Sequence, residues 1–416
     1  MSSYYTTNST YGAFYKDKIG KIEENVISHE QRLEKLAQKN EYNLEKNNDF
    51  GDTINKQIKS HKERLEKLKE LDEKGIPMAN YIIPSLTGLN NLGNTCYINT
   101  CLQNLIHCSS FINKFLEAFK YYNNSTPISN SFYNLITQIT DNNRYNHKDF
   151  ISPIEFVDTF RNIHPNFEKY QEHDTQEFCR YLLQDFNKEL NEVKNPGSYK
   201  AALPKNNNKK ESYLNYVKYC LSKEKSIITD LFKGFFSFEY VCECGYKEYS
   251  FSQFLDLPIQ MDSNVYGYDL YQMLKNNFYK KSYVDMGENC SFCRRTSKKY
   301  ENMKIALLPN ILIISLQRTN PKNGMKNEAS VKFYEGLDLS EIIDTEIQRT
   351  NSTKYKLFAI SNHIGNINSG HYYSQIKIDN NWYCFEDSKV YKIGTQIDMN
   401  TKEVYTLFFK RHNLKY

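Results

Sequence analysis

A cysteine at the start of a predicted helix is the first residue in this sequence that could act as a nucleophile. Cys96 follows a turn-rich segment with two glycines, 88–95, and precedes apolar residues at helical spacing, 98, 102, 105 and 106. The positive end of a helix dipole stabilises a thiolate, which predicts a lowered pKa for the Cys96 thiol. The Asn91 amide and loop N–H groups could donate to an oxyanion. The alternative is a buried structural cysteine behind a capping loop.

A thiol nucleophile needs a base, and His371 is the best-placed histidine. It follows small residues and begins a predicted strand, 371–378, which a turn joins to a second strand, 381–385. This hairpin returns Glu386 and Asp387 alongside His371, where an acid could orient the imidazole. Adjacent residues of a strand point to opposite faces, so we expect only one of them to contact the ring. Both stay candidates at this stage.

Two close pairs of cysteines could bind a metal ion. Cys242 and Cys244 form the first pair, and Cys290 and Cys293 form the second, 46 residues further on. In a reducing compartment, four such thiols predict a tetrahedral structural zinc site. The spacing of the first pair is one residue short of the usual C-x-x-C. The alternative is a set of free thiols without metal.

An acidic segment precedes another predicted helix, 174–193. Asp174 and Glu177 have the spacing of a capping box, so their structural interpretation is a helix start.

Helical patterns dominate up to about residue 190, at 96–108, 152–163 and 174–193, and a polar loop is predicted for 195–212. After about 234 the segments rich in β-branched and aromatic residues predict strands. They lie at 235–241, 303–307, 311–318, 355–363, 371–378, 381–385 and 404–410. A helix-rich half followed by a strand-rich half predicts an α+β enzyme with its cleft between the two.

The N-terminal segment has a different composition. Residues 1–15 lack a period and are predicted to be disordered. An internal repeat, 28–36 and again 60–68, predicts a helical or coiled-coil-like extension over 16–75, which serves either as a partner-docking element or as a spacer. A linker over 76–87 leads to a catalytic domain at 88–416.

Composition narrows the class of protein. The 416 residues carry a net charge of +5 with acidic and basic side chains interspersed, which disfavours nucleic-acid binding. The sequence contains no run of 18 apolar residues, so no membrane span is predicted, and its N-terminus lacks a signal-peptide pattern. We therefore expect an intracellular protein, cytoplasmic or nuclear, whose ten cysteines are thiols or metal ligands.

Two segments resemble the catalytic boxes of the ubiquitin-specific proteases. Gly88–Gln103 is similar to the family's Cys box, and His363–Val390 is similar to its His box. The resemblance implies a papain-like fold with thumb, palm and fingers. It also implies hydrolysis of the isopeptide bond after the C-terminal glycine of ubiquitin, with Cys96 as nucleophile, Asn91 as oxyanion donor and His371 as base.

The same resemblance implies contacts with the basic tail of ubiquitin. Asp174 would meet a tail arginine, and the other channel candidates are Glu177, Phe178, Tyr372 and His363. It also implies that the zinc site pins the tips of the fingers, at about 234–305. Three positions depart from the family's pattern: Glu172 replaces Gln, Thr319 replaces Phe, and Glu386 replaces Asp or Asn.

The resemblance implies ubiquitin and ubiquitinated proteins as partners, but two alternatives stay open. The chain could process a ubiquitin-like modifier, because the catalytic boxes do not distinguish the modifiers. It could also be a ubiquitin-binding scaffold with weak catalysis, which the departures at Glu386 and Thr319 allow.

Overall fold

The structure is a computed structural model. It describes residues 86–120, 126–142, 148–194, 207–261, 267–279, 282–284, 289–295, 299–319, 324–347, 352–366 and 369–412. The predictions of disorder over 1–15, a helical extension over 16–75 and a linker up to residue 85 lie outside the described residues. Within the described ranges, no helix is both long and apolar enough to cross a membrane.

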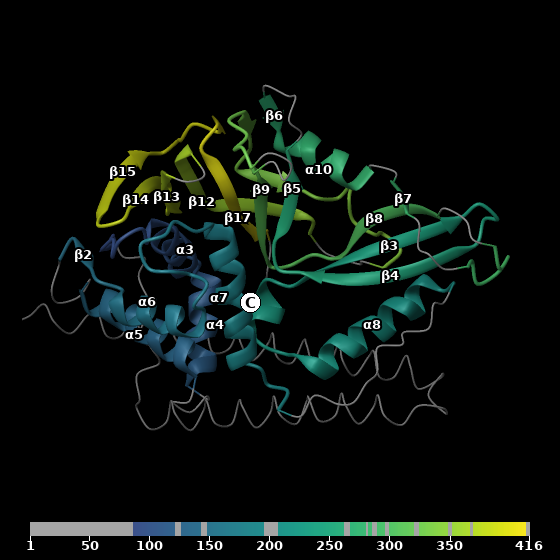
Figure 1. The fold of residues 1–416 in the computed structure, drawn as a ribbon, viewed down its shortest axis with the longest axis horizontal. Coiled ribbons are helices and arrows are strands. Elements are labelled where there is room, and N and C mark those ends of the chain that lie inside the picture. Colours follow the sequence, from purple (N-terminus) through teal and green to yellow (C-terminus); the bar gives the residue numbers. More distant parts are fainter. Residues whose placement is uncertain are drawn as a thin grey trace, which may run out of the picture. The chain divides into compact units, whose positions relative to one another are not determined.

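The first half forms a helical thumb around a core of phenylalanines (Figure 1). Phe111, Phe115, Phe132 and Phe186 lie with ring centroids 5.0–6.0 Å apart, distances at which aromatic pairs attract each other beyond their burial. Every residue of α3 is buried, so this helix is the central one. The helices are α3 (Cys96–Ile106), α4 (Ser109–Phe119), α5 (Pro127–Asp141), α6 (Ile154–Ile163), α7 (Thr175–Glu189), α8 (Lys209–Lys223) and α9 (Ile227–Leu231).

A four-stranded antiparallel sheet forms the fingers, in the order β4-β3-β8-β7. One face packs against α8, where the Tyr216 ring lies 5.4 Å from Phe235 and 5.8 Å from Phe251. The buried carboxylate of Glu248 accepts hydrogen bonds from Lys299 and Ser291 at 2.5 and 2.7 Å. The strands are β3 (Gly234–Cys242), β4 (Lys247–Phe254), β7 (Ser282–Val284) and β8 (Lys299–Leu307).

A larger mixed sheet forms the palm, in the order β15-β14-β13-β12-β17-β9-β5, with β11 paired to β12. Its strands are β5 (Leu257–Gln260), β9 (Ile311–Gln317), β11 (Gly336–Asp338), β12 (Lys354–Asn366), β13 (Ser369–Ile378), β14 (Asn381–Glu386), β15 (Lys389–Gly394) and β17 (Val404–Arg411). The smaller elements are β1 (Gly88–Leu89), β2 (Phe150–Ile151), β6 (Gly267–Asp269), α10 (Leu270–Tyr279), β10 (Ser330–Lys332) and β16 (Asn400–Thr401).

Buried hydrogen bonds join α3 to the palm. Asn104 donates from Nδ2 to Ser361 Oγ at 2.8 Å, and Ser374 donates from Oγ to the Thr100 carbonyl at 3.0 Å. Buried polar groups are costly unless paired, so these bonds set the angle at which α3 meets β12 and β13. The N-terminus of α3 thereby comes to the start of β13.

The predicted α+β class is confirmed, and each predicted strand overlaps an observed one. The prediction of a polar loop over 195–212 is wrong at its end, because α8 begins at Lys209. Asn208 accepts a hydrogen bond from the Glu211 backbone N–H and so caps this helix. Helices α4 and α5 were not predicted from the sequence.

Candidate active site

Cys96 is the first residue of α3 and is 4% exposed. The loop before it is held by the Asn91 side-chain oxygen, which accepts hydrogen bonds from the N–H groups of Gly93 and Thr95 at 2.9 and 3.2 Å. Gly93 and Asn94 both have positive φ angles, 93° and 51°, in the region that glycine and asparagine adopt most readily. This turn delivers the thiol to the helix start.

Burial raises the pKa of the Cys96 thiol to about 11. A hydrogen bond with the Tyr372 backbone opposes this shift, whereas the negative charges of Asp387 and Glu172 add to it. The predicted lowering of the pKa by the helix dipole is therefore wrong in this structure, because desolvation outweighs it. The thiol is protonated at neutral pH and needs a base to become a nucleophile.

The two candidate acids have separate partners. Glu386, the last residue of β14, places Oε1 3.5 Å from His371 Nε2. Asp387 lies in the following turn at φ 51° and accepts hydrogen bonds from the side-chain amides of Asn91 and Asn99, both at 2.8 Å. One acid thus contacts the imidazole, and the other holds the nucleophile loop.

Asn91 connects this loop to the acid turn. One hydrogen of its Nδ2 goes to Asp387, which orients the amide beside the N-terminus of α3. An amide NH₂ group carries two donors, so the second hydrogen stays available to an oxyanion.

A row of aromatic rings lies beside His371. The Tyr372 ring is 4.4 Å from His363 and 5.6 Å from Tyr405. The Tyr405 hydroxyl donates to Asp174, whose other carboxylate oxygen caps α7 at the N–H groups of Gln176 and Glu177. The structural prediction that Asp174 is an N-cap is confirmed. Burial and the Asp174 charge raise the pKa of Tyr405, which keeps its phenol a donor.

The remaining predicted substrate contacts lie in different environments. Phe178 has no exposed surface and packs 5.7 Å from the Tyr97 ring, so the expectation that it lines a channel is not met. Glu177 is exposed. Thr319, where the family's pattern has Phe, is exposed and forms a hydrogen bond with Tyr405.

Three residues have contacts that the sequence analysis did not anticipate. Glu172 accepts a hydrogen bond from the backbone N–H of Gly370, the residue before His371, at 2.8 Å. Asn99 contacts Asp387, and although it lies in the segment that resembles the Cys box, no role was predicted for it. Lys326 contacts His363 from a loop without any motif, so no sequence signal indicates this contact.

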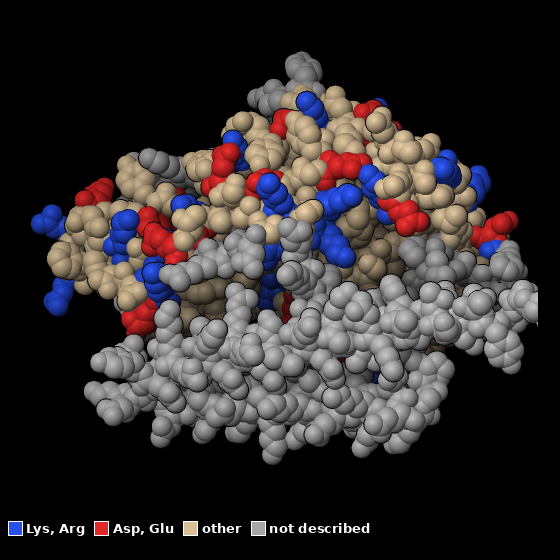
Figure 2. Space-filling model, turned by 180° about the vertical axis from the view of Figure 1, so that it is seen from behind, with Lys and Arg blue, Asp and Glu red and all other residues tan. Residues whose placement is uncertain are grey.

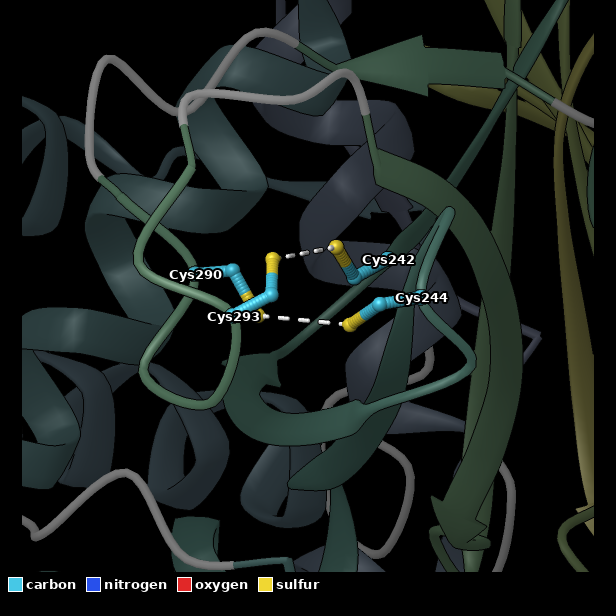
Figure 3. A group of neighbouring side chains, drawn as sticks. All are labelled: Cys242, Cys244, Cys290 and Cys293. Carbon is cyan, nitrogen blue, oxygen red and sulfur yellow. Dashed lines mark hydrogen bonds between the residues drawn. The ribbon is translucent and has the colours of Figure 1, made fainter.

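The four predicted metal ligands converge at the tips of β3 and β8 (Figure 3). Their sulfur atoms all lie within 4.8 Å of one another, with 3.9 Å from Cys242 to Cys293 and 3.8 Å from Cys244 to Cys290. A tetrahedral zinc with Zn–S bonds of about 2.3 Å requires sulfur atoms about 3.8 Å apart. The short first pair is accommodated by Gly245, which turns at φ 84°. This group could hold a metal ion.

Acidic and basic side chains are interspersed over the described part of the face in Figure 2, as they are along the chain.

A family model described as ubiquitin carboxyl-terminal hydrolase matches residues 87–409. A Bos taurus protein named ubiquitin carboxyl-terminal hydrolase 2 is 30% identical over 347 residues, which cover 78% of this chain and 55% of that protein. Its Gallus gallus counterpart is 29% identical over 352 residues, covering 80% of this chain and 96% of that one. This chain therefore spans about half the length of the bovine relative.

Solved structures share the fold. The SAGA Ubp8/Sgf11/Sus1/Sgf73 DUB module bound to ubiquitin aldehyde matches with a TM-score of 0.62 at 24% identity, covering 87% of this chain and 76% of that one. A form of the module bound to monoubiquitin matches with a TM-score of 0.63 at 22% identity and the same two coverages.

Proposed function

Because this chain belongs to the ubiquitin carboxyl-terminal hydrolase family, we propose that it is a thiol-dependent deubiquitinase. It hydrolyses the isopeptide or peptide bond after the C-terminal glycine of ubiquitin on protein conjugates. The observation that carries this proposal is the convergence of α3, β13 and the β14 turn. It gathers a cysteine, a histidine and two adjacent acids, from three different segments, around one helix N-terminus.

The reaction begins with the protonated thiol of Cys96. His371 accepts its proton as the sulfur attacks the carbonyl carbon of the terminal glycine. The oxyanion that forms accepts hydrogen bonds from the free hydrogen of the Asn91 amide and from backbone N–H groups at the start of α3. His371 then protonates the leaving lysine amine. Water next attacks the carbonyl carbon of the thioester, which releases ubiquitin and restores the Cys96 thiol.

Glu386 is the orienting acid in this proposal. Its contact at 3.5 Å is with Nε2, which leaves Nδ1 to exchange the proton with the thiol. Asp387 supports the oxyanion donor instead, because it holds Asn91 and Asn99 through one carboxylate oxygen each.

The basic tail of ubiquitin is proposed to run past Tyr372, His363 and Tyr405 to the nucleophile. Asp174, which holds the Tyr405 hydroxyl, supplies a negative charge for a tail arginine, and the exposed Glu177 adds a second. A tail that ends in two glycines suits a narrow channel, since no side chain then has to fit near Cys96.

The cysteine group of the fingers is proposed to bind one structural zinc through Cys242, Cys244, Cys290 and Cys293. The sulfur separations fit a four-thiolate site, and such a site has no free position for substrate. Zinc would supply cross-linking of the finger tips and no catalytic step.

Reaction with ubiquitin that carries a C-terminal electrophile tests the proposed function. We expect a covalent adduct with the full chain and none with Cys96→Ala. Cys101→Ala, which removes a buried thiol five residues further along α3, is the matched control and should keep the adduct. An adduct only with a ubiquitin-like modifier would favour the modifier-protease alternative. Binding of ubiquitin without any adduct would favour the scaffold.

A further inference from the structure

A nearly buried lysine contacts the histidine that lies beside the proposed catalytic one. The Lys326 side chain is 7% exposed. Its Nζ lies 2.8 Å from His363 Nδ1, and it also donates to the carbonyl oxygens of His363 and Gly365 at 3.2 and 2.8 Å. These three acceptors satisfy the three hydrogens of the ammonium group.

These contacts determine which nitrogen of His363 carries a proton. An ammonium group can only donate, so Nδ1 must accept through its lone pair. A neutral imidazole with a lone pair at Nδ1 carries its hydrogen at Nε2. The ring is also neutral, because burial and the charge of Lys326 lower the pKa of His363 to about 4.

The protonated nitrogen lies against the backbone next to His371. A Cβ atom added to Gly370 would come within 2.1 Å of His363 Nε2, so only glycine leaves room for the ring. No hydrogen bond to Nε2 is found among the described residues. The groups that face His363 are Lys326 and Arg318 from the loop after β9, His371 and Tyr372 from β13, and Tyr405 from β17.

We propose that Lys326 is a positioning residue that holds His363 as a neutral Nε2–H donor for a backbone carbonyl of the substrate's tail. This proposal rests on the proposed function for its substrate, and it names the residue that sets the hydrogen-bonding character of the channel. A tail of glycines has no side chains, so the acceptor that it offers is a backbone carbonyl. A neutral donor also adds no positive charge to a channel that has to admit a basic tail.

The first test measures the tautomer of His363 without any substrate. Long-range ¹H–¹⁵N NMR of the full chain labelled at histidine, with His363 assigned through His363→Gln, should show Nε2–H and no titration between about pH 5.5 and 8. In Lys326→Met, the pKa of His363 should rise but stay below its ordinary value, because burial still lowers it, and the neutral ring should populate both tautomers. Lys326→Arg keeps a cationic donor and should behave as the wild type. A wild-type ring protonated at Nδ1, or titrating near 6.5, would overturn the proposal.

The second test measures the contribution of the His363 Nε2–H donor to substrate binding. With a ubiquitin substrate at about pH 8, Lys326→Met should raise KM by about 2- to 10-fold, the range of one neutral hydrogen bond, with kcat changed less than about two-fold. The increase should shrink as the pH falls through the pKa that the NMR titration gives for His363 in this variant, because protonation restores a hydrogen at Nε2. A misfolded channel would raise KM at every pH, and this result would contradict the proposal. If the chain does not process ubiquitin, the NMR result still decides the tautomer.

Discussion

At the scale of single residues, Glu386 and Asp387 divide two tasks between adjacent carboxylates. Glu386 ends a strand and faces the His371 ring, whereas Asp387 turns at a positive φ and faces α3. From the sequence alone, these two acids are equal candidates. Because adjacent residues of a strand point to opposite faces, the two carboxylates are predicted to have different partners. This rule does not predict which of them contacts the His371 ring, because that depends on how β13 and β14 twist.

Glu386→Gln should lower kcat by about 100-fold and leave KM and the melting temperature nearly unchanged, because the imidazolium loses its counter-charge while the fold keeps an amide of the same size. Asp387→Ala should lower kcat and also the melting temperature, since Asn91 loses its carboxylate acceptor and Asn99 loses the shortest of its three hydrogen bonds. Steady-state kinetics and thermal unfolding distinguish the two. If neither variant lowers turnover, the assignment of the triad is wrong.

Glu172 raises the pKa of Cys96 through its charge and holds Gly370 through a hydrogen bond. Glu172→Gln keeps an acceptor for Gly370 and removes only the charge. The pKa of the thiol should fall, so alkylation of Cys96 by iodoacetamide at about pH 7 should become roughly 5-fold faster, as about 1 kcal/mol of charge–charge interaction predicts. The rate–pH profile should shift to lower pH.

Glu172→Ala is the matched comparison, because it removes both the charge and the hydrogen bond. Alkylation should again become faster, but kcat should fall as the start of β13 loosens around His371. Unchanged alkylation in both variants would show that the Glu172 charge does not act on the thiol.

At the scale of elements, the types of residues and their spacing were sufficient to predict local structure. The predicted hairpin of β13 and β14 was confirmed, because alternating aromatic residues and the turn between them specify it locally. The contacts of Lys326 with His363 could not be predicted, since the loop after β9 carries no motif and acquires its position only from tertiary packing. The lowered thiol pKa was predicted wrongly for the same reason: the dipole of α3 is local, whereas burial depends on the whole cleft.

In the zinc proposal, the four cysteines stabilise the finger tips by holding a metal ion between them. Purified protein should contain one zinc per chain, and Cys293→Ser should lose it, lower the melting temperature and weaken ubiquitin binding. Alkylation of Cys96 by a small reagent should be unaffected, because the finger tips lie far along β3 from the thumb. Cys108→Ala, which removes a buried thiol outside the group, should keep the zinc. Well under one zinc per chain in the wild-type protein would contradict the proposal.

At the scale of the whole catalytic unit, a single carboxylate joins its three parts. Asp256 lies between β4 and β5 and is 8% exposed. It accepts hydrogen bonds from Gln176 and Arg180 of α7 at 2.7–3.2 Å, and from Ser315 of β9 at 3.0 Å. Thumb, fingers and palm therefore share one acceptor. No sequence pattern indicated it, because its donors lie 59 to 80 residues away.

The donors of Asp256 differ in burial, and this difference predicts how much each contributes. Arg180 is 43% exposed, so its ion pair contributes at most about 1 kcal/mol. Gln176 and Ser315 are buried, and each costs about 1–3 kcal/mol if it is left without a partner. Asp256→Ala should therefore lower the free energy of unfolding by about 3 kcal/mol or more, and Arg180→Ala by less than about 1 kcal/mol, in urea unfolding followed by fluorescence. Hydrogen exchange should also become faster at both α7 and β9 in Asp256→Ala. Equal losses in the two variants would mean that the exposed ion pair, and not the buried hydrogen bonds, holds the three parts together.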